Sequence, residues 1–415
     1  MIDVIWYRDC SFRPRYAWLQ FLFSFWNLSR CFRIIVFKGG AGTQSEVFGG
    51  TAACCIHGPV SAAERRLRKT DNPKKIPALQ IQIGGLAMLL LSKKDIESVV
   101  SMQEIIDADL QAFKMVSEKS ADIPLRTRIP APKEEGNFLF MPAYAEQMDA
   151  AALKVVNIFP HNREKNMDTA PAQILFIDGK TGYITAMLDG NYVTQVRTGA
   201  ASGAAFQLLA RKDASVGALF GTGSQAEQQL SAMLTACDLQ EVRIFSRNQE
   251  RRDAFTEKMR VKFADKNVRL VSARSSDEAI DDADVVITVT SSPVPVFDGS
   301  RIKPGCTISC IGTYEPEKHE LDPAVLLRAS KIYCDSVDAV LAESGDLLIP
   351  LNDGTISRND VTGELGQLAA GQLPGRENDE EIIVFESVGV AVQDLCAAKA
   401  ILARAEKSGV GTRWE

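Results

Sequence analysis

Residues 216–230, VGALFGTGSQAEQQL, decide the fold of this chain. The apolar run 216–220 predicts a buried strand, and the spacing of apolar residues over 225–237 predicts a helix. The connection between them, 221–226, is a G-x-G-x-x-A turn. A strand, such a turn and a helix form the first half of a dinucleotide-binding unit, in which phosphates meet free N–H groups at the helix N-terminus.

Each small residue of this turn has a physical role. Gly221 permits the tight turn, Gly223 lets the backbone approach a pyrophosphate, and Ala226 lets the helix pack closely on the sheet. A glycine-rich turn also occurs in folds that bind no nucleotide, so the flanking sequence has to support the assignment. It does so, because further apolar runs alternate with helical segments, as a doubly wound parallel sheet requires. These runs are 241–245, 284–290, 306–311, 331–335 and 381–389.

The end of the second strand indicates which cofactor is bound. An acidic residue there would bind the ribose 2′-OH of NAD, whereas an arginine accommodates a 2′-phosphate. This chain has Ser246, Arg247 and Asn248 there, and no carboxylate before Glu250. We therefore expect NADP(H), with NAD(H) as the alternative and with Arg247 as a plain surface charge in that case.

Composition excludes several classes of function. The 415 residues carry a net charge of −6, and no basic run with interleaved aromatic residues suggests nucleic acid. Nine scattered cysteines and three histidines match no zinc pattern, so we expect no metal and a reducing, cytoplasmic setting.

Residues 1–87 differ from the rest of the chain. Aromatic residues and arginines crowd into their first half, and no strand or helix period persists after residue 38. The uncharged run 16–29 is shorter than the ~20 residues that cross a bilayer. We expect 1–87 to be a poorly ordered extension preceding a natural start at Met88; a membrane-peripheral anchor is the alternative.

Between residue 88 and the glycine turn, four basic residues stand out. Arg126 and Arg128 lie in an extended run, where a period of two puts both on one face. Lys154 interrupts an apolar strand, where burial is costly unless the ammonium has a partner. We expect Arg197 to open a small-residue helix, 199–210, close to the cleft between two domains, although it could also be a surface charge.

The chain resembles the ornithine cyclodeaminase/mu-crystallin family from residue 88 to residue 415. Nine motifs agree with that family in order and approximate spacing. They are Pro124-x-Arg126-Thr, Met141-Pro-Ala-Tyr144, Lys154, Asp189-Gly190, Arg197-Thr198-Gly-Ala-Ala, Gly221-x-Gly223-x-Gln225-Ala226, Glu320-Leu-Asp322, Glu343-Ser-Gly-Asp346 and Ser387-x-Gly389.

The resemblance implies a fold, an assembly and a set of site residues. It implies a homodimer of α/β chains, each with a Rossmann-type doubly wound NAD(P)-binding domain, 201–384, and a smaller α+β substrate-binding and dimerisation domain, 88–200 with 385–415. Arg126, Lys154 and Arg197 would then contact the substrate carboxylate and imine. The positions expected to bind the cofactor are Thr198, Gly221, Gly223, Ser224, Gln225, Ala226, Ser246, Arg247, Asn248, Thr290 and Val388.

One departure from the family selects among activities. The family's cyclodeaminases have an Asp at the position of Tyr314, and that Asp serves the ring-closing step. Relatives without it resemble reductases of cyclic ketimines, so we expect hydride transfer from NADPH to the C=N carbon of a cyclic imino acid. Lys154 is the expected proton donor, and Tyr314 and Glu343 are lesser candidates. Alternatively, Lys154 has only a structural role, in an ion pair that holds a loop.

Two other functions stay open on the sequence alone. One is another amino-acid enzyme of the same family, namely a cyclodeaminase, an alanine-type dehydrogenase or an N-alkyl amino-acid synthase. The other is a non-catalytic nucleotide-binding protein of the crystallin kind. We expect the partners to be a small imino or amino acid and a second copy of the chain, without nucleic acid or a membrane.

Overall fold

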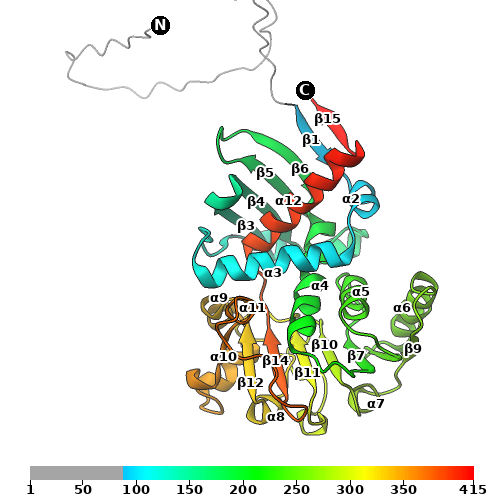
Figure 1. Ribbon diagram of the computed structural model, residues 1–415. Helices are drawn as coiled ribbons and strands as arrows, with labels where there is room; N and C mark the ends of the chain where they lie inside the picture. The colour runs from blue at the N-terminus through cyan, green and yellow to red at the C-terminus, as the bar shows by residue number, and fades with distance from the viewer. Residues whose placement is uncertain (1–86) are drawn as a thin grey trace, which may run out of the picture. The chain divides into compact units, whose positions relative to one another are not determined.

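The computed structural model describes residues 87–415, and the N-terminal extension expected at 1–87 lies almost wholly outside the described residues. Residues Ile81–Glu415 form one compact unit, whose described part contains two sheets (Figure 1). The two sheets confirm the predicted α/β class with a Rossmann-type half and a smaller α+β half.

The first sheet has seven strands in the order β15-β1-β6-β5-β4-β3-β2. All neighbours are antiparallel except β1 and β6, which run parallel. The hairpin predicted around 179–182 joins β5 to β6. The strands are β1 Met88–Leu91, β2 Thr127–Ala131, β3 Gly136–Ala145, β4 Ala150–Ile158, β5 Ala172–Asp178, β6 Ile184–Asp189 and β15 Thr412–Trp414.

Two helices cover one face of this sheet. α12 (Ala391–Ser408) lies across β3, β4 and β5, and α3 (Met102–Glu118) packs against α12 (Figure 1). α2 (Lys93–Val99) and α3 both begin with a capping box, at Ser92 and Ser101, because each serine accepts from the N3 backbone while the N3 carboxylate accepts from the serine N–H. We call this sheet and its helices the first lobe. Since α12 contacts β3, β4 and β5, the C-terminal helix packs back on the first lobe, as predicted.

The second sheet has eight parallel strands in the order β13-β12-β14-β11-β10-β7-β8-β9. Its strands are β7 Val216–Phe220, β8 Glu241–Phe245, β9 Arg269–Ser272, β10 Val285–Thr288, β11 Thr307–Cys310, β12 Lys331–Cys334, β13 Gly363–Glu364 and β14 Ile383–Glu386. Helices alternate with them: α5 Ala226–Ala236, α6 Gln249–Lys262, α7 Ser276–Ile280, α8 Pro323–Arg328, α9 Val337–Glu343, α10 Gly345–Asn352 and α11 Leu365–Ala369.

Four strands, β10, β11, β12 and β14, are shorter than the apolar runs that predicted them, and the difference is largest at β10 and β14. β10 stops at Thr288, and the chain then turns so that the Thr290 N–H reaches the Glu320 carboxylate. β14 stops at Glu386: Ser387 N still donates to the Cys310 carbonyl oxygen, whereas Ser387 Oγ and Gly389 N donate to a buried aspartate.

The helix predicted at 199–210 begins much earlier than expected. α4 spans Gly190–Leu209, and its N-cap is Asp189, whose carboxylate accepts from Tyr192 N at 2.8 Å. The prediction that Arg197 opens the helix is therefore wrong. A glycine and several β-branched residues give 190–198 weak helix propensity, which packing against the rest of the lobe overrides.

α4 connects the first lobe to the second lobe, which consists of the eight-stranded sheet and its helices. It packs against α3 and α12 of the first lobe and against α5, β11 and β14 of the second. Small residues at Gly199 and Gly203 allow close approach, since a Cβ on Gly199 would lie 2.5 Å from the Gln228 carbonyl oxygen. Among residues 87–415, no helix combines the length and the apolar character that crossing a bilayer requires.

Candidate active site

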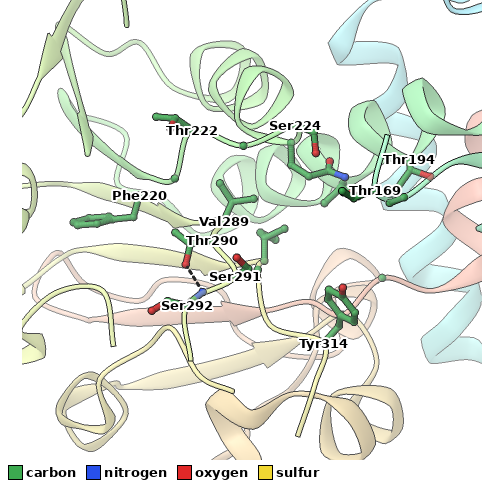
Figure 2. A pocket seen from close by; sticks show the side chains of 18 of the residues that line it. Thr169, Thr194, Phe220, Thr222, Ser224, Val289, Thr290, Ser291, Ser292 and Tyr314 are labelled. Carbon is green, nitrogen blue, oxygen red and sulfur yellow. Dashed lines mark hydrogen bonds between the residues drawn. The ribbon is translucent and has the colours of Figure 1, made fainter. Parts of the chain in front are cut away.

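One cavity of about 730 Å³ lies where the carboxyl ends of the second sheet face β3, β4 and α4. Its volume is in the range of pockets that bind small molecules and cofactors. Side chains from both lobes line it, and Figure 2 shows Ser224 and Tyr314 on opposite sides of the space. The described lining includes six cationic side chains and no Asp or Glu.

The glycine turn forms one end of the cavity. Gly221 has φ +120°, and a Cβ there would lie 2.5 Å from the Val289 carbonyl oxygen, so only glycine fits. A Cβ on Gly223 would meet no atom within 4 Å, which leaves the backbone open to a ligand. No described side chain caps α5, but Ala226 N donates to the Gly223 carbonyl oxygen and Gln228 N to that of Gln225, so only part of the first turn is available to an anion. This open turn fits the phosphates of a dinucleotide.

The end of β8 adds polar and cationic groups to the cavity. Ser246 accepts a hydrogen bond from Thr222 Oγ1 at 3.2 Å, and Asn248 caps α6 by accepting from Arg251 N at 2.8 Å. The side chains of Arg247 and Arg251 are exposed and line the cavity, and neither has an ion-pair partner within residues 87–415. Arg251 was not predicted from the sequence.

A loop after β10 forms another wall. Thr290 N donates to Glu320 Oε1 at 2.6 Å, and Ser292 N donates to Thr290 Oγ1 at 3.0 Å (Figure 2). Burial raises the pKa of Glu320 to about 8. Asp346 supports the same loop system, because its Oδ1 accepts from Glu320 N and from Leu321 N.

Lys154 reaches the cavity from the middle of β4. Its Nζ lies 2.7 Å from Asp394 Oδ2, and both side chains are 1% exposed. The sequence argument that a lysine in this strand needs a partner is thus confirmed. Burial lowers the pKa of Lys154 to about 7, with a further decrease from Arg197 and an opposing increase from Asp394.

Arg197 lies inside α4 and is buried beside the same aspartate. Its Nε is 3.3 Å from Asp394 Oδ1, and its Nη1 donates to Gln393 Oε1 at 3.4 Å. The next residue, Thr198, lines the cavity and accepts from Gln229 Nε2 through its carbonyl oxygen.

Arg126 approaches from the segment just before β2. Its Nη2 donates to the carbonyl oxygens of Val388 and Gly389 at 3.1 and 3.0 Å, and lies 2.8 Å from Glu343 Oε2. Arg128 does not line the cavity and instead donates to Asn137 Oδ1. The side chains of Arg126 and Arg128 therefore have different partners and do not both line the cavity, although both belong to one extended run.

The structure brings nearly all of the predicted site residues together. Lys154, Arg126, Arg197, Tyr314, Thr198, Gly221, Gly223, Ser224, Gln225, Ser246, Arg247, Asn248, Thr290 and Val388 all line the one cavity. Glu343 and Ala226 do not line it. Glu343 pairs with Arg126, and burial raises its pKa, whereas Ala226 is buried against the sheet.

Several residues of the site escaped the sequence argument. Asp394 is the most important, and the available signal was two polar residues, Gln393 and Asp394, within an otherwise apolar stretch of the C-terminal helix. The apolar wall of β3 and β4 was also missed. It consists of Leu139, Met141, Val156 and Ile158. Within residues 87–415, no three His, Cys, Asp or Glu side chains are grouped as metal ligands would be.

The fold and this cavity define a two-lobed Rossmann-type protein whose first lobe places Lys154 and Arg126 in the same cavity as the glycine turn of the second lobe. Residues 87–409 match the sequence model of the Ornithine cyclodeaminase/mu-crystallin family. A Δ1-pyrroline-2-carboxylate reductase of Bacillus cereus is 36% identical over 328 residues, which are 79% of this chain and 100% of that protein. The chain belongs to the ornithine cyclodeaminase/mu-crystallin family, as its motifs indicated.

Solved structures agree with this assignment. The Δ1-pyrroline-2-carboxylate reductase of Thermococcus litoralis, in complex with NADH and L-proline, has a TM-score of 0.74 and 37% identity, covering 78% of this chain and 99% of that one. An archaeal alanine dehydrogenase dimer with bound NAD has a TM-score of 0.72 and 33% identity, covering 79% and 99%. Both similarities confirm the predicted fold class.

Proposed function

We propose that this protein is an NAD(P)H-dependent reductase of cyclic imino acids, acting on Δ1-pyrroline-2-carboxylate or its six-membered homologue. The observation that carries the proposal is a buried lysine with a pKa of about 7, beside two arginines, in the same cavity as the glycine turn. The names of the Bacillus and Thermococcus relatives support the same reaction.

Each of the three cations has a separate task in this reaction. The guanidinium groups of Arg126 and Arg197 bind the substrate carboxylate, one of them in bidentate fashion, and so fix the ring in the cavity. Lys154 donates its proton to the imine nitrogen, because a protonated C=N accepts a hydride far more readily. A reduced nicotinamide cofactor, whose pyrophosphate the glycine turn would hold, would supply the hydride. The products would be the cyclic amino acid, the oxidised cofactor and a neutral Lys154, which takes a proton back from water.

The rest of the lining favours a ring without a second charge. Met141 lies opposite Lys154 across β3 and β4, and Leu139 and Val156 extend the same apolar wall. Ring methylene groups gain from contact with such a wall. The cationic side chain of ornithine would find no carboxylate among the described lining residues, and Tyr314 replaces the aspartate that the family's cyclodeaminases use. We therefore propose cyclodeamination only as the second candidate reaction, after imine reduction.

The adenosine end of the cavity supports NADPH over NADH. Arg247 and Arg251 are exposed cations at the end of β8, and Ser246 stands where an acidic residue would bind a 2′-OH. The Thermococcus relative was solved with NADH and the archaeal relative with NAD, so NADH stays the alternative.

We further propose a homodimer built on the uncovered face of the first sheet. Phe138 and Tyr144 point away from the buried face of β3 and are each 39% exposed. An apolar sheet face of this kind suits a second copy of the chain, and the archaeal relative is described as a dimer. We also propose domain limits at 200/201 and 384/385, so that α4 is shared between the lobes.

Free thiols at the described cysteines suit a cytoplasmic location.

A substrate panel tests the proposed reaction. Purified protein is mixed with five- or six-membered cyclic imino acids and with NADPH or NADH, and nicotinamide absorbance is followed. We expect rapid oxidation with at least one ring size, a lower KM for NADPH, and proline or pipecolate as product. Ammonia release from ornithine, or turnover of pyruvate with ammonium but of no cyclic imine, would overturn the proposal.

A further inference from the structure

Three of the six cations that line the cavity, Arg126, Lys154 and Arg197, contact one short stretch of chain, the turn before α12 and its first residues. The carbonyl oxygens of Val388 and Gly389 accept from Arg126, and Asp394 contacts both Lys154 and Arg197. The two Asp394 contacts use different carboxylate oxygens, 2.7 Å from Lys154 Nζ and 3.3 Å from Arg197 Nε.

We propose that Asp394 is the positioning residue of this site, holding the Lys154 ammonium on one oxygen and the Arg197 guanidinium on the other. The inference rests on the proposed reduction of a cyclic imine. In this role Asp394 keeps the Lys154 ammonium and the Arg197 guanidinium at a fixed separation. It also stabilises the charged form of the buried Lys154. Asp394 itself does not line the cavity, so it acts through the two cations.

The surrounding charges show why this role falls to Asp394. Lys154 faces Arg197 from α4 and Arg126 from the segment before β2, and both disfavour an ammonium. Glu343 pairs with Arg126 rather than with the lysine. Asp109 from α3 accepts from Gln393 Nε2 at 2.9 Å rather than contacting the lysine, and burial raises its pKa well above the usual range.

Asp335 is another buried carboxylate, and its hydrogen bonds go to residues other than Lys154. Asp335, which follows β12, accepts from Ser387 Oγ and Gly389 N, each at 2.7 Å. Among residues 87–415, Asp394 is therefore the carboxylate in direct contact with the Lys154 ammonium. A purely structural role is the competing explanation, because an acidic residue in the first turn of a helix also favours the helix dipole.

The pH dependence of kcat separates the two roles. In Asp394→Asn the opposing charge is lost, so the pKa of Lys154 falls, and the alkaline limb of kcat should move to lower pH by about 1–3 units. Asp109→Asn is the matched control: it replaces a neighbouring buried carboxyl group that hydrogen-bonds to Gln393 and forms no ion pair with Lys154, so its alkaline limb should stay where the wild type has it. Cofactor affinity, measured by fluorescence titration, should be unchanged in both variants.

Each outcome decides the matter. A folded Asp394→Asn protein whose pH profile coincides with that of the wild type overturns the inference, whereas a wild type that reduces no cyclic imine overturns the proposed function instead. If Asp394→Asn does not fold, Asp394→Glu decides. It keeps the charge but displaces both oxygens, so kcat should fall ~10-fold or more with the alkaline limb nearly in place. Wild-type kcat in that variant would exclude positioning.

Discussion

The cavity holds two groups of cations that differ in how they are anchored. Lys154, Arg126 and Arg197 are largely buried, and each contacts a carboxylate, whose geometry fixes the charged group. Arg247 and Arg251, at the end of β8, are exposed and have no ion-pair partner among the described residues. Arginine thus occurs both as a buried side chain held by a carboxylate and as an exposed side chain without an ion-pair partner among the described residues.

This difference indicates a division of labour. A reacting carbon and nitrogen must be held to within fractions of an ångström, so the groups that bind and protonate the substrate need fixed positions. A phosphate at the far end of a dinucleotide only has to be recognised, and long exposed side chains can close on it. Removing an anchored cation should therefore affect turnover strongly, and removing an exposed one should affect cofactor choice mildly.

The largest effect is expected for Lys154→Met. Without the proton donor, kcat for a cyclic imino acid should fall ~10²–10⁴-fold, the usual contribution of general acid catalysis. The measurement is steady-state reduction at saturating cofactor. Since Asp394 then loses one buried partner, Tm should fall as well, and unchanged cofactor affinity shows that the protein is folded. Retention of more than ~10% of wild-type kcat would remove Lys154 from the chemistry.

Arg126→Ala should come next. Loss of a charge-assisted contact to the substrate carboxylate costs about 1.5–3 kcal/mol, so kcat/KM should fall ~10–150-fold while cofactor affinity stays the same. Arg128→Ala is the control, because Arg128 lies two positions further along the same segment and does not line the cavity. Equal losses in both variants would show that the segment, and not the Arg126 guanidinium, matters.

A smaller effect is expected at the exposed group. Arg247→Ala should raise the KM for NADPH ~10-fold, since an exposed charge contact contributes about 1 kcal/mol or slightly more. The KM for NADH should hardly change, because it lacks the 2′-phosphate. A parallel rise for both cofactors would mean that Arg247 serves the shared part of the dinucleotide, and the assignment to NADPH would fail.

The smallest effect concerns Glu320, which lies behind the loop after β10 and accepts from Thr290 N. Burial raises the pKa of this carboxyl group to about 8, so the folded protein keeps its proton at a pH where the unfolded chain has lost it. The stability it contributes is complete below its unfolded pKa of ~4.3 and is lost as pH rises through about 8. Glu320→Gln stays neutral, so its Tm should fall less than that of the wild type between about pH 6 and about pH 9, by a few degrees. Parallel curves would contradict the raised pKa.

The sequence predicted those parts of the molecule that depend on local patterns. The strand, turn and helix around Gly221 follow from apolar runs and small residues, and they occur as predicted. Family motifs then marked Lys154, Arg126 and Arg197, which do line one cavity. Each of these features is encoded within a few neighbouring residues.

Features that depend on long-range packing were not predictable. Asp394 has no motif of its own, and its partners Lys154 and Arg197 are remote in sequence, so only the fold reveals the shared carboxylate. The start of α4 was missed for a related reason: its first turns are weak helix formers that become helical through burial. Glu343 was expected to be near the chemistry, and the fold instead places it against Arg126.

A crystal structure of this protein with NADP⁺ and L-proline would test the central claim most directly. We expect the proline carboxylate between the guanidinium groups of Arg126 and Arg197, the ring against Met141, and the ring nitrogen about 3 Å from Lys154 Nζ. Proline bound with its carboxylate away from both arginines, or with its nitrogen out of reach of Lys154, would contradict the account.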